Sequence, residues 1–458
     1  MVALGHAGIG NFKGCLPGTY HGVSGRHVQE CLDEFCCRLN RRFWEYQIPN
    51  RLPKLCVMHQ PDFLQPVGCS WPCKFLMMDI QALKDCVPTS PAFVLDEIGV
   101  LKGLKALAIL RERSGCKLLY SIKSLPLSAV LELSKPYVDG FSVSSLFEAR
   151  LADEVLAGQG RLHLTTPGIR PDEINELTSL CSHISCNSIS QYGMVSNVAK
   201  NQASIGLRIN PKLSFTADAR YDPCRQYSKL GADMDDVLRS DIVGEIKGLH
   251  FHTVFSATDY APLMQTLDKL RHFMGDGFTG LDWLNLGGGY LFDQIADDSG
   301  FVERIAQLKN DFDLEVTIEP GNAVVGDAGY LLATVIDCFN SDGKTIAVLD
   351  TSVNHHPQVF EYQRQPEVCG HDPNGLYPVI LAGSTCLAGD IFGEYRFNQA
   401  LLVGDKVVFK QVGAYSLVKS SRFNGYNLPD VYTANGEQIR RIKHHTYQDY
   451  RQQWMSDE

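Results

Sequence analysis

The sequence lacks an excess of basic residues, a long apolar run and a leader-like start, and each absence argues against a class of protein. Lysines and arginines number 42 against 52 aspartates and glutamates, for a net charge of −10. This balance argues against a nucleic-acid surface and suits a cationic substrate. No apolar run approaches the length of a membrane helix, and the N-terminus lacks the basic-then-apolar order of a signal peptide. We therefore expect a cytoplasmic protein that binds neither nucleic acid nor membrane.

The fifteen cysteines are not spaced like a metal site. Eight of them fall within the first ninety residues, where Cys36-Cys37 and Cys69-x3-Cys73 are the densest groups. A structural zinc site needs two paired clusters at short spacing, and these groups do not form them. We predict scattered reduced thiols and no bound metal.

Residues 1–76 differ in composition from the rest of the chain. Glycine-rich and cysteine-rich pieces surround one amphipathic segment over 27–44, and the prolines beyond it prevent a long helix. Within residues 1–60, two words resemble the C-terminal tail of an insertion-sequence transposase. These words are Gly18-Thr19-Tyr20-His21-Gly22-Val23-Ser24 and Leu32-Asp33-Glu34-Phe35-Cys36-Cys37-Arg38-Leu39-Asn40-Arg41-Arg42. We interpret residues 1–76 as a fused or mis-started remnant and expect the functional protein to begin near Met77 or Met78; an accessory segment that packs on the main body is the alternative.

From about residue 90 onward, strand-like runs alternate with helix-period segments. The runs occupy 117–123, 140–145, 161–166, 183–188, 204–210, 246–254, 283–289 and 314–321. Eight strands that alternate with helices are what a (β/α)8 barrel requires, whereas a doubly wound sheet usually has fewer. We predict a TIM-type barrel over residues 99–329.

Beyond Gly329 the strands continue without long helices between them. They occupy 330–338, 344–350, 377–383, 406–413, 429–433 and 437–443. Turn signals such as Ser341-Asp342-Gly343 separate them, and a length of 458 residues favours two domains. We predict a second, all-β domain made of residues 330–458 together with 77–98, which include a strand-like run over 92–95.

A lysine ends the first predicted barrel strand, in Leu118-Leu119-Tyr120-Ser121-Ile122-Lys123-Ser124. An ammonium group at the end of a buried strand is costly to desolvate without a partner. One interpretation is an edge lysine whose head reaches water. The other is a lysine that points into a pocket and forms a Schiff base.

The ends of the other strands carry residues that suit pyridoxal phosphate, which favours the second interpretation. Active groups of such a barrel gather at the carboxyl ends of its strands, and here these ends carry Arg208, His252, Gly287-Gly288-Gly289 and Glu319. The glycines let the backbone approach a phosphate and offer N–H donors to it. Glu319 would pair with the pyridinium nitrogen, and His252 would lie flat against the ring. Taken singly, these residues are more often a turn, a loop and a core histidine; together they indicate a cofactor site.

The words around these residues resemble the fold-type III pyridoxal-phosphate decarboxylases, which include ornithine and diaminopimelate decarboxylases. The barrel words are Tyr120-Ser121-Ile122-Lys123, Ser144-Ser145-Leu146-Phe147-Glu148, Gly206-Leu207-Arg208-Ile209-Asn210-Pro211, Tyr227-Ser228-Lys229-Leu230-Gly231, Leu249-His250-Phe251-His252-Thr253, Asn285-Leu286-Gly287-Gly288-Gly289 and Glu319-Pro320-Gly321. The β-domain words are Leu349-Asp350-Thr351-Ser352, Gly383-Ser384-Thr385-Cys386-Leu387-Ala388-Gly389-Asp390 and Phe423-Asn424-Gly425. The likeness spans about Thr89 to Tyr432 and is nearest to the carboxynorspermidine/carboxyspermidine decarboxylases.

The resemblance implies the alanine racemase/ornithine decarboxylase-like fold, assembled as a head-to-tail homodimer with two shared active sites. Lys123 would then hold pyridoxal phosphate, and Tyr415 would touch the cofactor phosphate. Cys386 and Asp390 would reach into the partner's site. There Cys386 would protonate the α-carbon after CO2 leaves, and Asp390 would hold the distal amine of the substrate. Taken alone, Cys386 is equally a small buried hydrophobe.

Three positions bear on which substrate is used. The carboxynorspermidine enzymes place acids where this chain has Asn322 and Gln358, and another near Ser256. Diaminopimelate enzymes differ after Cys386, and ornithine enzymes carry arginine at the position of Asn322. We hypothesise a substrate with fewer positive charges than carboxynorspermidine, or one held in another register. A non-catalytic regulatory relative and a racemase on the same barrel are the other possibilities.

Overall fold

The computed structural model describes residues 78–199, 202–216, 218–436 and 438–456. All of them belong to one compact unit that runs over Lys74–Glu458. The interpretations of residues 1–76 fall outside the described residues and stay predictions.

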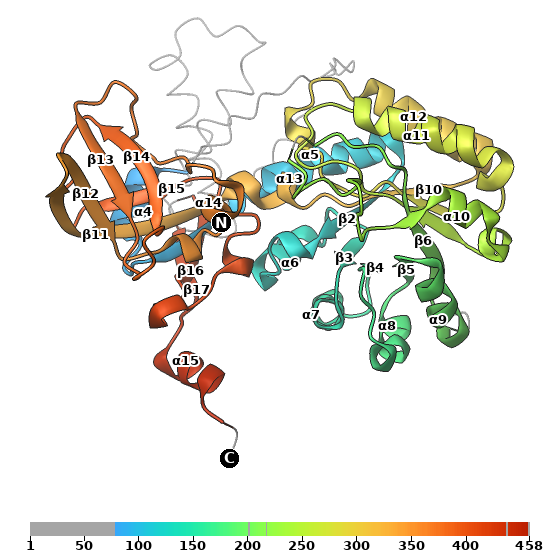
Figure 1. Cartoon of the computed structure of the whole chain (residues 1–458), viewed down its shortest axis with the longest axis horizontal. Helices are drawn as coiled ribbons and strands as arrows, with labels where there is room; N and C mark the ends of the chain where they lie inside the picture. Colours follow the sequence, from blue (N-terminus) through green and yellow to red (C-terminus); the bar gives the residue numbers. More distant parts are fainter. Residues whose placement is uncertain (1–77, 200–201, 217, 437, 457–458) are drawn as a thin grey trace, which may run out of the picture. The chain divides into compact units, whose positions relative to one another are not determined.

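Eight parallel strands close into a barrel, which confirms the predicted fold. Each strand pairs with the next along the chain, and the circle closes where β10 pairs with β2. The barrel strands are β2 (Lys117–Ser121), β3 (Gly140–Val143), β4 (Arg161–Thr165), β5 (His183–Cys186), β6 (Ser204–Asn210), β8 (Gly248–His250), β9 (Trp283–Asn285) and β10 (Glu315–Ile318). The two-residue strand β7 (Ala232–Asp233) pairs with the end of β6 outside this circle. Figure 1 shows the strands with the helices that follow them.

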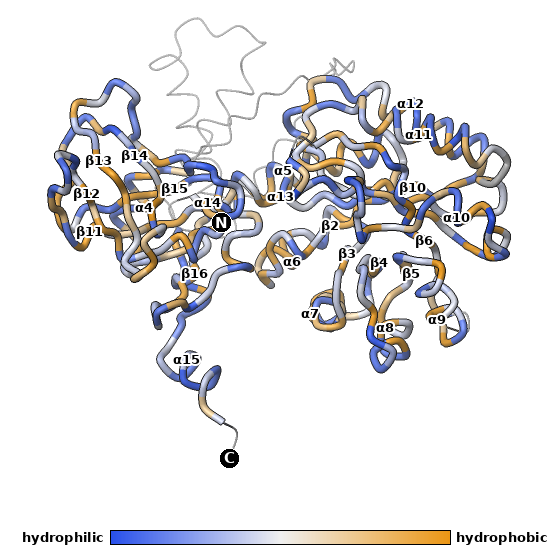
Figure 2. Tube along the Cα trace, viewed as in Figure 1, coloured by the Kyte–Doolittle hydropathy of each residue, from blue (hydrophilic) through white to orange (hydrophobic). Residues whose placement is uncertain are grey.

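The helices of the barrel bury one stripe each. In α11 the buried residues Leu263, Leu267, Leu270 and Met274 recur at helical spacing, and Figure 2 shows polar and apolar residues alternating along α11 and α12. The helices are α5 (Glu97–Ser114), α6 (Ser128–Ser134), α7 (Leu146–Leu156), α8 (Ile174–Leu180), α9 (Ile189–Ala199), α10 (Met234–Arg239), α11 (Ala261–Met274), α12 (Ser299–Phe312) and α13 (Asn322–Val325). Within the described part of the chain, no helix combines the length and the apolar character needed to cross a bilayer.

A second, mixed sheet is built from strands that precede and follow the barrel in the sequence. Strand β1 (Ala92–Asp96) precedes the barrel, yet it pairs antiparallel with β11 and parallel with β16. The sheet order is β14-β13-β12-β11-β1-β16-β17, and β15 pairs with β11. The other strands are β11 (Gly329–Ser341), β12 (Lys344–Leu349), β13 (Tyr377–Ala382), β14 (Ile391–Phe397), β15 (Lys406–Phe409), β16 (Asp430–Asn435) and β17 (Gln438–Lys443). The short helices α4 (Ile80–Cys86), α14 (Gln358–Tyr362) and α15 (Tyr447–Trp454) lie between or beyond them in the sequence.

The prediction missed strand β14. The register between β13 and β14 shifts at Leu381/Ala382, so the partner of Ala382 is Ile391 and Phe392 has no partner. The buried residues of β14 are consequently Phe392, Tyr395 and Phe397. A spacing of three followed by two breaks the alternation by which strands are recognised.

Most of the predicted barrel strands are longer than the observed ones, at their carboxyl ends. The predicted run 246–254 contains only Gly248–His250 as β8, and 283–289 contains only Trp283–Asn285 as β9. The remaining residues form the loops at the carboxyl end of the barrel, and these loops carry the predicted site residues.

Candidate active site

Lys123 follows β2 directly, in the 3₁₀ turn Ile122–Ser124. Burial lowers the pKa of its ammonium group; the Glu319 carboxylate opposes this shift, and the Arg208 guanidinium adds to it. A lysine with a lowered pKa has a larger share of neutral amine, the form that attacks a carbonyl carbon. The environment of Lys123 therefore suits Schiff-base formation.

Glu319 comes directly after β10 and is 5% exposed. Its Oε1 accepts a hydrogen bond from Nδ2 of Asn285 at 2.7 Å, and Nε2 of His250 lies 4.0 Å from its Oε2. Arg208, on β6, is also buried. Its burial lowers the guanidinium pKa to about 10, while Glu319 raises it. At neutral pH the arginine stays protonated, so Glu319 interacts with two basic side chains, those of Lys123 and Arg208.

His252 lies two residues beyond β8, with its ring against the glycine loop. Its Nδ1 accepts a hydrogen bond from the N–H of Gly288 at 3.2 Å, so this nitrogen carries no proton. Burial lowers the imidazole pKa well below its ordinary value, and the charges of Lys123 and Arg208 lower it further. We infer a neutral ring, which suits packing against a cofactor.

The three glycines of the loop are required by close backbone contacts. Gly287 and Gly289 have φ of 69° and 91°, and a Cβ on Gly288 would lie 2.2 Å from the carbonyl oxygen of Glu319. The N–H of Gly287 donates to Oδ1 of Asn285 at 2.9 Å, and that of Gly288 donates to His252. Two of the three N–H groups predicted to meet a phosphate are therefore engaged inside the protein. Of these three glycines, Gly289 is the one whose N–H has no acceptor within the described residues, which leaves it for a ligand.

Tyr415 belongs to a loop that follows β15, and this loop is tied to the turn of Lys123. The N–H of Tyr415 donates to the carbonyl oxygen of Ser124 at 2.9 Å. Burial raises the pKa of the Tyr415 phenol to about 12. A phenol that stays protonated can donate a hydrogen bond to a phosphate oxygen, as predicted for this residue.

Cys386 and Asp390 lie in the loop between β13 and β14, and the structure gives them different surroundings. Cys386 is exposed, and its N–H donates to Oδ1 of Asn424 at 2.8 Å. Asp390 is 3% exposed. Its carboxylate accepts the N–H of Val353 at 2.8 Å, the N–H of Thr385 at 3.0 Å and the hydroxyl of Thr385. The carboxylate is thus held by Thr385 of its own loop and by the turn that begins at Val353, and its contact with a substrate amine stays a prediction.

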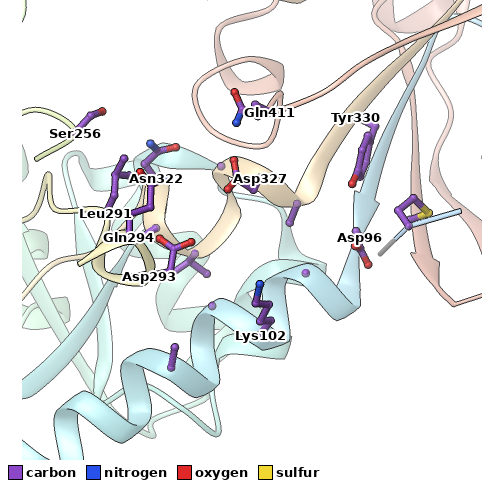
Figure 3. A pocket seen from close by; sticks show the side chains of 18 of the residues that line it. Asp96, Lys102, Ser256, Leu291, Asp293, Gln294, Asn322, Asp327, Tyr330 and Gln411 are labelled. Carbon is purple, nitrogen blue, oxygen red and sulfur yellow. The ribbon is translucent and has the colours of Figure 1, made fainter. Parts of the chain in front are cut away.

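Ser256, Asn322 and Gln358 line one open groove of about 590 Å³. Figure 3 shows Ser256 and Asn322 at its wall, with Asp293 and Asp327 close by. Burial raises the pKa of Asp327, and the neighbouring charge of Asp293 raises it further. The groove that contains the three neutral positions is thus also lined by three carboxylates, those of Asp96, Asp293 and Asp327. Lys102 and Arg364 also line it.

Two residues close to the site were not singled out by the sequence. Glu148 accepts the N–H of Ser144 at 2.7 Å; burial raises the pKa of its carboxyl group, and Lys123 lowers it. The spacing of Ser145 and Glu148 indicates only a helix cap, and Ser145 does cap α7. Asn285 belongs to the segment Asn285–Gly289 that resembles the family, but nothing in the sequence indicated a role for its side chain. Closure of the barrel, which no local pattern encodes, brings both residues to the site.

Two buried histidines precede Gln358 and make folding stability depend on pH. His355 and His356 are 3% and 4% exposed, and Nδ1 of each is hydrogen-bonded at 2.9 Å, to the hydroxyls of Thr351 and Ser416. Burial lowers the pKa of both imidazoles to about 4. The unfolded chain therefore binds more protons than the folded chain between pH 4 and about 6.5.

Above about pH 6.5 both histidines are neutral in the folded and the unfolded chain, and protonation does not lower the free energy of unfolding. We expect this free energy to fall as the pH drops from about 6.5 to 4, by at most about 3 kcal/mol for each histidine. Urea unfolding of the chain at pH 7, 5.5 and 4.5 measures this loss. Replacing both histidines with asparagine makes the profile less steep, while the other buried histidines keep their share of it. An equally steep profile in the double variant contradicts the assignment.

Comparison with known proteins relates this chain to pyridoxal-dependent decarboxylases. Residues 57–413 match the family model for "Pyridoxal-dependent decarboxylase, C-terminal sheet domain". The chain is 33% identical over 381 residues to a carboxynorspermidine/carboxyspermidine decarboxylase of Campylobacter jejuni, covering 79% of this chain and 97% of that protein. It is also 33% identical over 348 residues to a carboxyaminopropylagmatine decarboxylase of Synechocystis, covering 75% and 89%. No comparison supports the transposase likeness of residues 1–60.

A solved structure agrees with the fold. The carboxynorspermidine decarboxylase of Campylobacter jejuni, complexed with norspermidine, superposes with a TM-score of 0.74 at 30% identity. The superposition covers 80% of this chain and all of that one. A diaminopimelate decarboxylase from Helicobacter pylori superposes with a TM-score of 0.71 at 19% identity, which shows a shared fold.

Proposed function

The chain belongs to the pyridoxal-dependent decarboxylase family. We propose that it decarboxylates a carboxylated polyamine, either carboxynorspermidine to norspermidine or carboxyspermidine to spermidine. One observation carries the proposal: Lys123 and Glu319 lie in one buried site at the carboxyl ends of the barrel strands. Relatives with this activity cover three quarters or more of the chain.

The residues present fit pyridoxal phosphate. Lys123 offers an amine of lowered pKa, and Glu319 offers a buried carboxylate for a protonated ring nitrogen. The glycine loop leaves no room for side chains next to the ends of β8 and β10, and the Gly289 N–H remains for a phosphate oxygen. When bound, the cofactor supplies an electron sink for the pair that remains after the carboxylate leaves as CO2.

The chain's own residues hold and protect this chemistry. Lys123 would hold the cofactor through its amine and give way to the amine of the substrate. Glu319 would keep a proton on the atom it faces, because a buried carboxylate stabilises a neighbouring positive charge. His252, whose pKa is lowered by burial, would stay neutral and lie against the cofactor ring. Burial of these groups excludes water from the reacting carbon.

We propose a homodimer in which Cys386 acts in the partner's site. Its thiol is exposed, and no hydrogen bond within the described residues links it to Lys123. An exposed thiol on a loop whose backbone is held by Asn424 and Asp390 is available to a second subunit. There it would donate the proton that replaces CO2 at the α-carbon.

The three neutral positions of the groove leave one alternative, a less cationic amino acid as substrate. A charged hydrogen bond contributes on the order of 1.5–3 kcal/mol, and Ser256, Asn322 and Gln358 supply none of that kind. Against this, Asp293 and Asp327 line the same groove, which supports a polyamine held in another register.

A substrate panel tests the proposed function. Purified protein is given carboxynorspermidine, carboxyspermidine, carboxyaminopropylagmatine, diaminopimelate, ornithine and lysine, and CO2 release is measured. We expect kcat/KM for carboxynorspermidine or carboxyspermidine to exceed that for the three plain amino acids at least about 10-fold. A higher value for diaminopimelate, ornithine or lysine supports the less cationic substrate and contradicts the proposal.

Neutralising the groove carboxylates should weaken substrate binding. We expect Asp293→Asn together with Asp327→Asn to raise KM for the preferred polyamine about 10-fold with little change in kcat, because the lost charge pairs act equally on substrate and transition state. Steady-state kinetics measure both constants. The control is Asp337→Asn, which removes an exposed aspartate of β11. An unchanged KM in the double variant places the substrate elsewhere.

A further inference from the structure

Asn285 is the last residue of β9 and is fully buried. Its side-chain amide makes polar contacts with three partners. Nδ2 donates to Oε1 of Glu319 at 2.7 Å and lies 3.2 Å from Nδ1 of His163, while Oδ1 accepts the N–H of Gly287 at 2.9 Å. The Gly287 N–H can only face an acceptor, so the orientation of the amide is determined.

These bonds join the two ends of the proposed cofactor site. Glu319 faces one end, and Gly287 begins the loop at the other. The backbone reinforces the link, since the N–H of Glu319 donates to the carbonyl oxygen of Gly287 at 2.8 Å. A shift of the amide of Asn285 would therefore move the carboxylate and the loop together.

Within the described part of the chain, Asn285 is the one side chain that donates a hydrogen bond to the Glu319 carboxylate. Neither ring nitrogen of His250 has a partner among the described residues. Burial lowers the pKa of His250 and of His163 well below the ordinary value, so both are neutral. Lys123 and Arg208 act on Glu319 through their charge, without a hydrogen bond to it.

We propose that Asn285 is a positioning residue that keeps the Glu319 carboxylate aimed at the cofactor ring and couples it to the glycine loop. The inference rests on the proposed function only in that Glu319 serves pyridoxal phosphate. Asn285 acts through Glu319 and Gly287, and it needs no contact with substrate or cofactor.

Two variants separate the donor contacts of the amide from its acceptor contact with Gly287. Asn285→Asp keeps the size of the side chain and an acceptor for Gly287, but it loses the donor and places a second carboxylate beside Glu319. Two such carboxylates hold one proton between them when the pH is low enough. Asn285→Ala removes all three contacts.

The test measures cofactor binding, independently of decarboxylation. The protein is freed of cofactor with a carbonyl-trapping amine and titrated with pyridoxal phosphate at pH 6 and pH 8.5. We expect Asn285→Asp to weaken binding about 10-fold relative to the unmodified chain at pH 8.5, and only about 2-fold at pH 6, where the shared proton restores a donor. If the ratio of the two dissociation constants, variant over unmodified chain, is the same at both pH values, the proposal is overturned.

A double-mutant cycle gives a second readout. Asn285→Ala should weaken binding about 10-fold in the unmodified chain and less than about 3-fold when Glu319→Gln is already present, because its effect passes through that carboxylate. Equal effects in both backgrounds mean a merely structural role and overturn the proposal. If the alanine variant does not fold, the pH ratio of Asn285→Asp decides.

Asn187 provides the matched control. Like that of Asn285, its amide accepts a hydrogen bond from the N–H of a glycine, here Gly231 at 2.8 Å. Its Nδ2 donates instead to a backbone carbonyl, that of Lys229, at 2.8 Å. It has no carboxylate partner, so we expect Asn187→Asp to show the same cofactor affinity ratio at both pH values. If pyridoxal phosphate binds as described but no panel substrate is decarboxylated, the proposed function fails and this inference stands.

Discussion

Replacing Lys123 with alanine lowers kcat for the preferred substrate by about 10⁴-fold or more, because both the covalent attachment of the cofactor and the returning amine are lost. The absorbance of the bound cofactor at about 420 nm is lost as well. The pKa of Lys123 is lowered in the folded chain, and this chemistry requires a neutral amine. Addition of a small primary amine should restore part of the activity, since it supplies the missing group without its tether.

Lys117 is the control for this prediction, because it lies at the other end of the same strand. Its Nζ is 3.5 Å from Oδ1 of Asp139, and its side chain is 36% exposed. We expect Lys117→Ala to keep kcat within about 2-fold, as is usual for an exposed ion pair. Full activity of the Lys123→Ala chain would remove Lys123 from the mechanism.

Mixing two inactive chains restores about a quarter of the normal activity, if each active site is shared between two subunits. Cys386→Ala alone should lower kcat about 10²-fold, the usual effect of losing a general acid. When chains carrying Lys123→Ala and Cys386→Ala are unfolded and refolded together, half of the dimers are mixed. Each mixed dimer has one site with both native residues and one with neither.

Complementation separates a shared site from a site within one chain. If Cys386 acts in its own subunit, every site in the mixture lacks one of the two residues, and the activity stays at that of the variants. Size-exclusion chromatography of the mixture confirms that dimers formed. Restored activity in the absence of dimers would contradict the account equally.

Much of the barrel could be predicted because its signal is local. The eight strands recur as apolar runs, and the buried Leu118, Leu119 and Tyr120 of β2 are one example. Strand β14 was missed because a register shift breaks its alternation. The strand-like run over 92–95 was assigned to the β domain from the sequence, but its pairing with β11 and β16 joins residues more than 230 positions apart, and no local pattern encodes that pairing.

The site was predictable in position and less so in hydrogen bonding. The rule that active groups gather at strand ends located Lys123, His252 and Glu319. It could not show that the N–H groups of Gly287 and Gly288 are already used, because that depends on side chains from other strands. Asp390 is a similar case, since its enclosure by Val353 and Thr385 arises from the folded loop.

The groove lined by Ser256, Asn322 and Gln358 shows the same limit. Ser256, Asn322 and Gln358 are far apart in the sequence, and their likeness to acidic positions of relatives was visible there. That Asp293 and Asp327 share the groove with them follows only from the fold. The loss of three acids therefore does not by itself mean a less cationic substrate.

The central claim is that Lys123 carries pyridoxal phosphate in this chain, and borohydride reduction followed by peptide mapping tests it most directly. The purified protein is reduced, digested and analysed by mass spectrometry. The account predicts that the absorbance at about 420 nm disappears and that the reduced cofactor is found on the peptide containing Lys123 alone. A stable adduct on another lysine, or none on a protein saturated with pyridoxal phosphate, would contradict it.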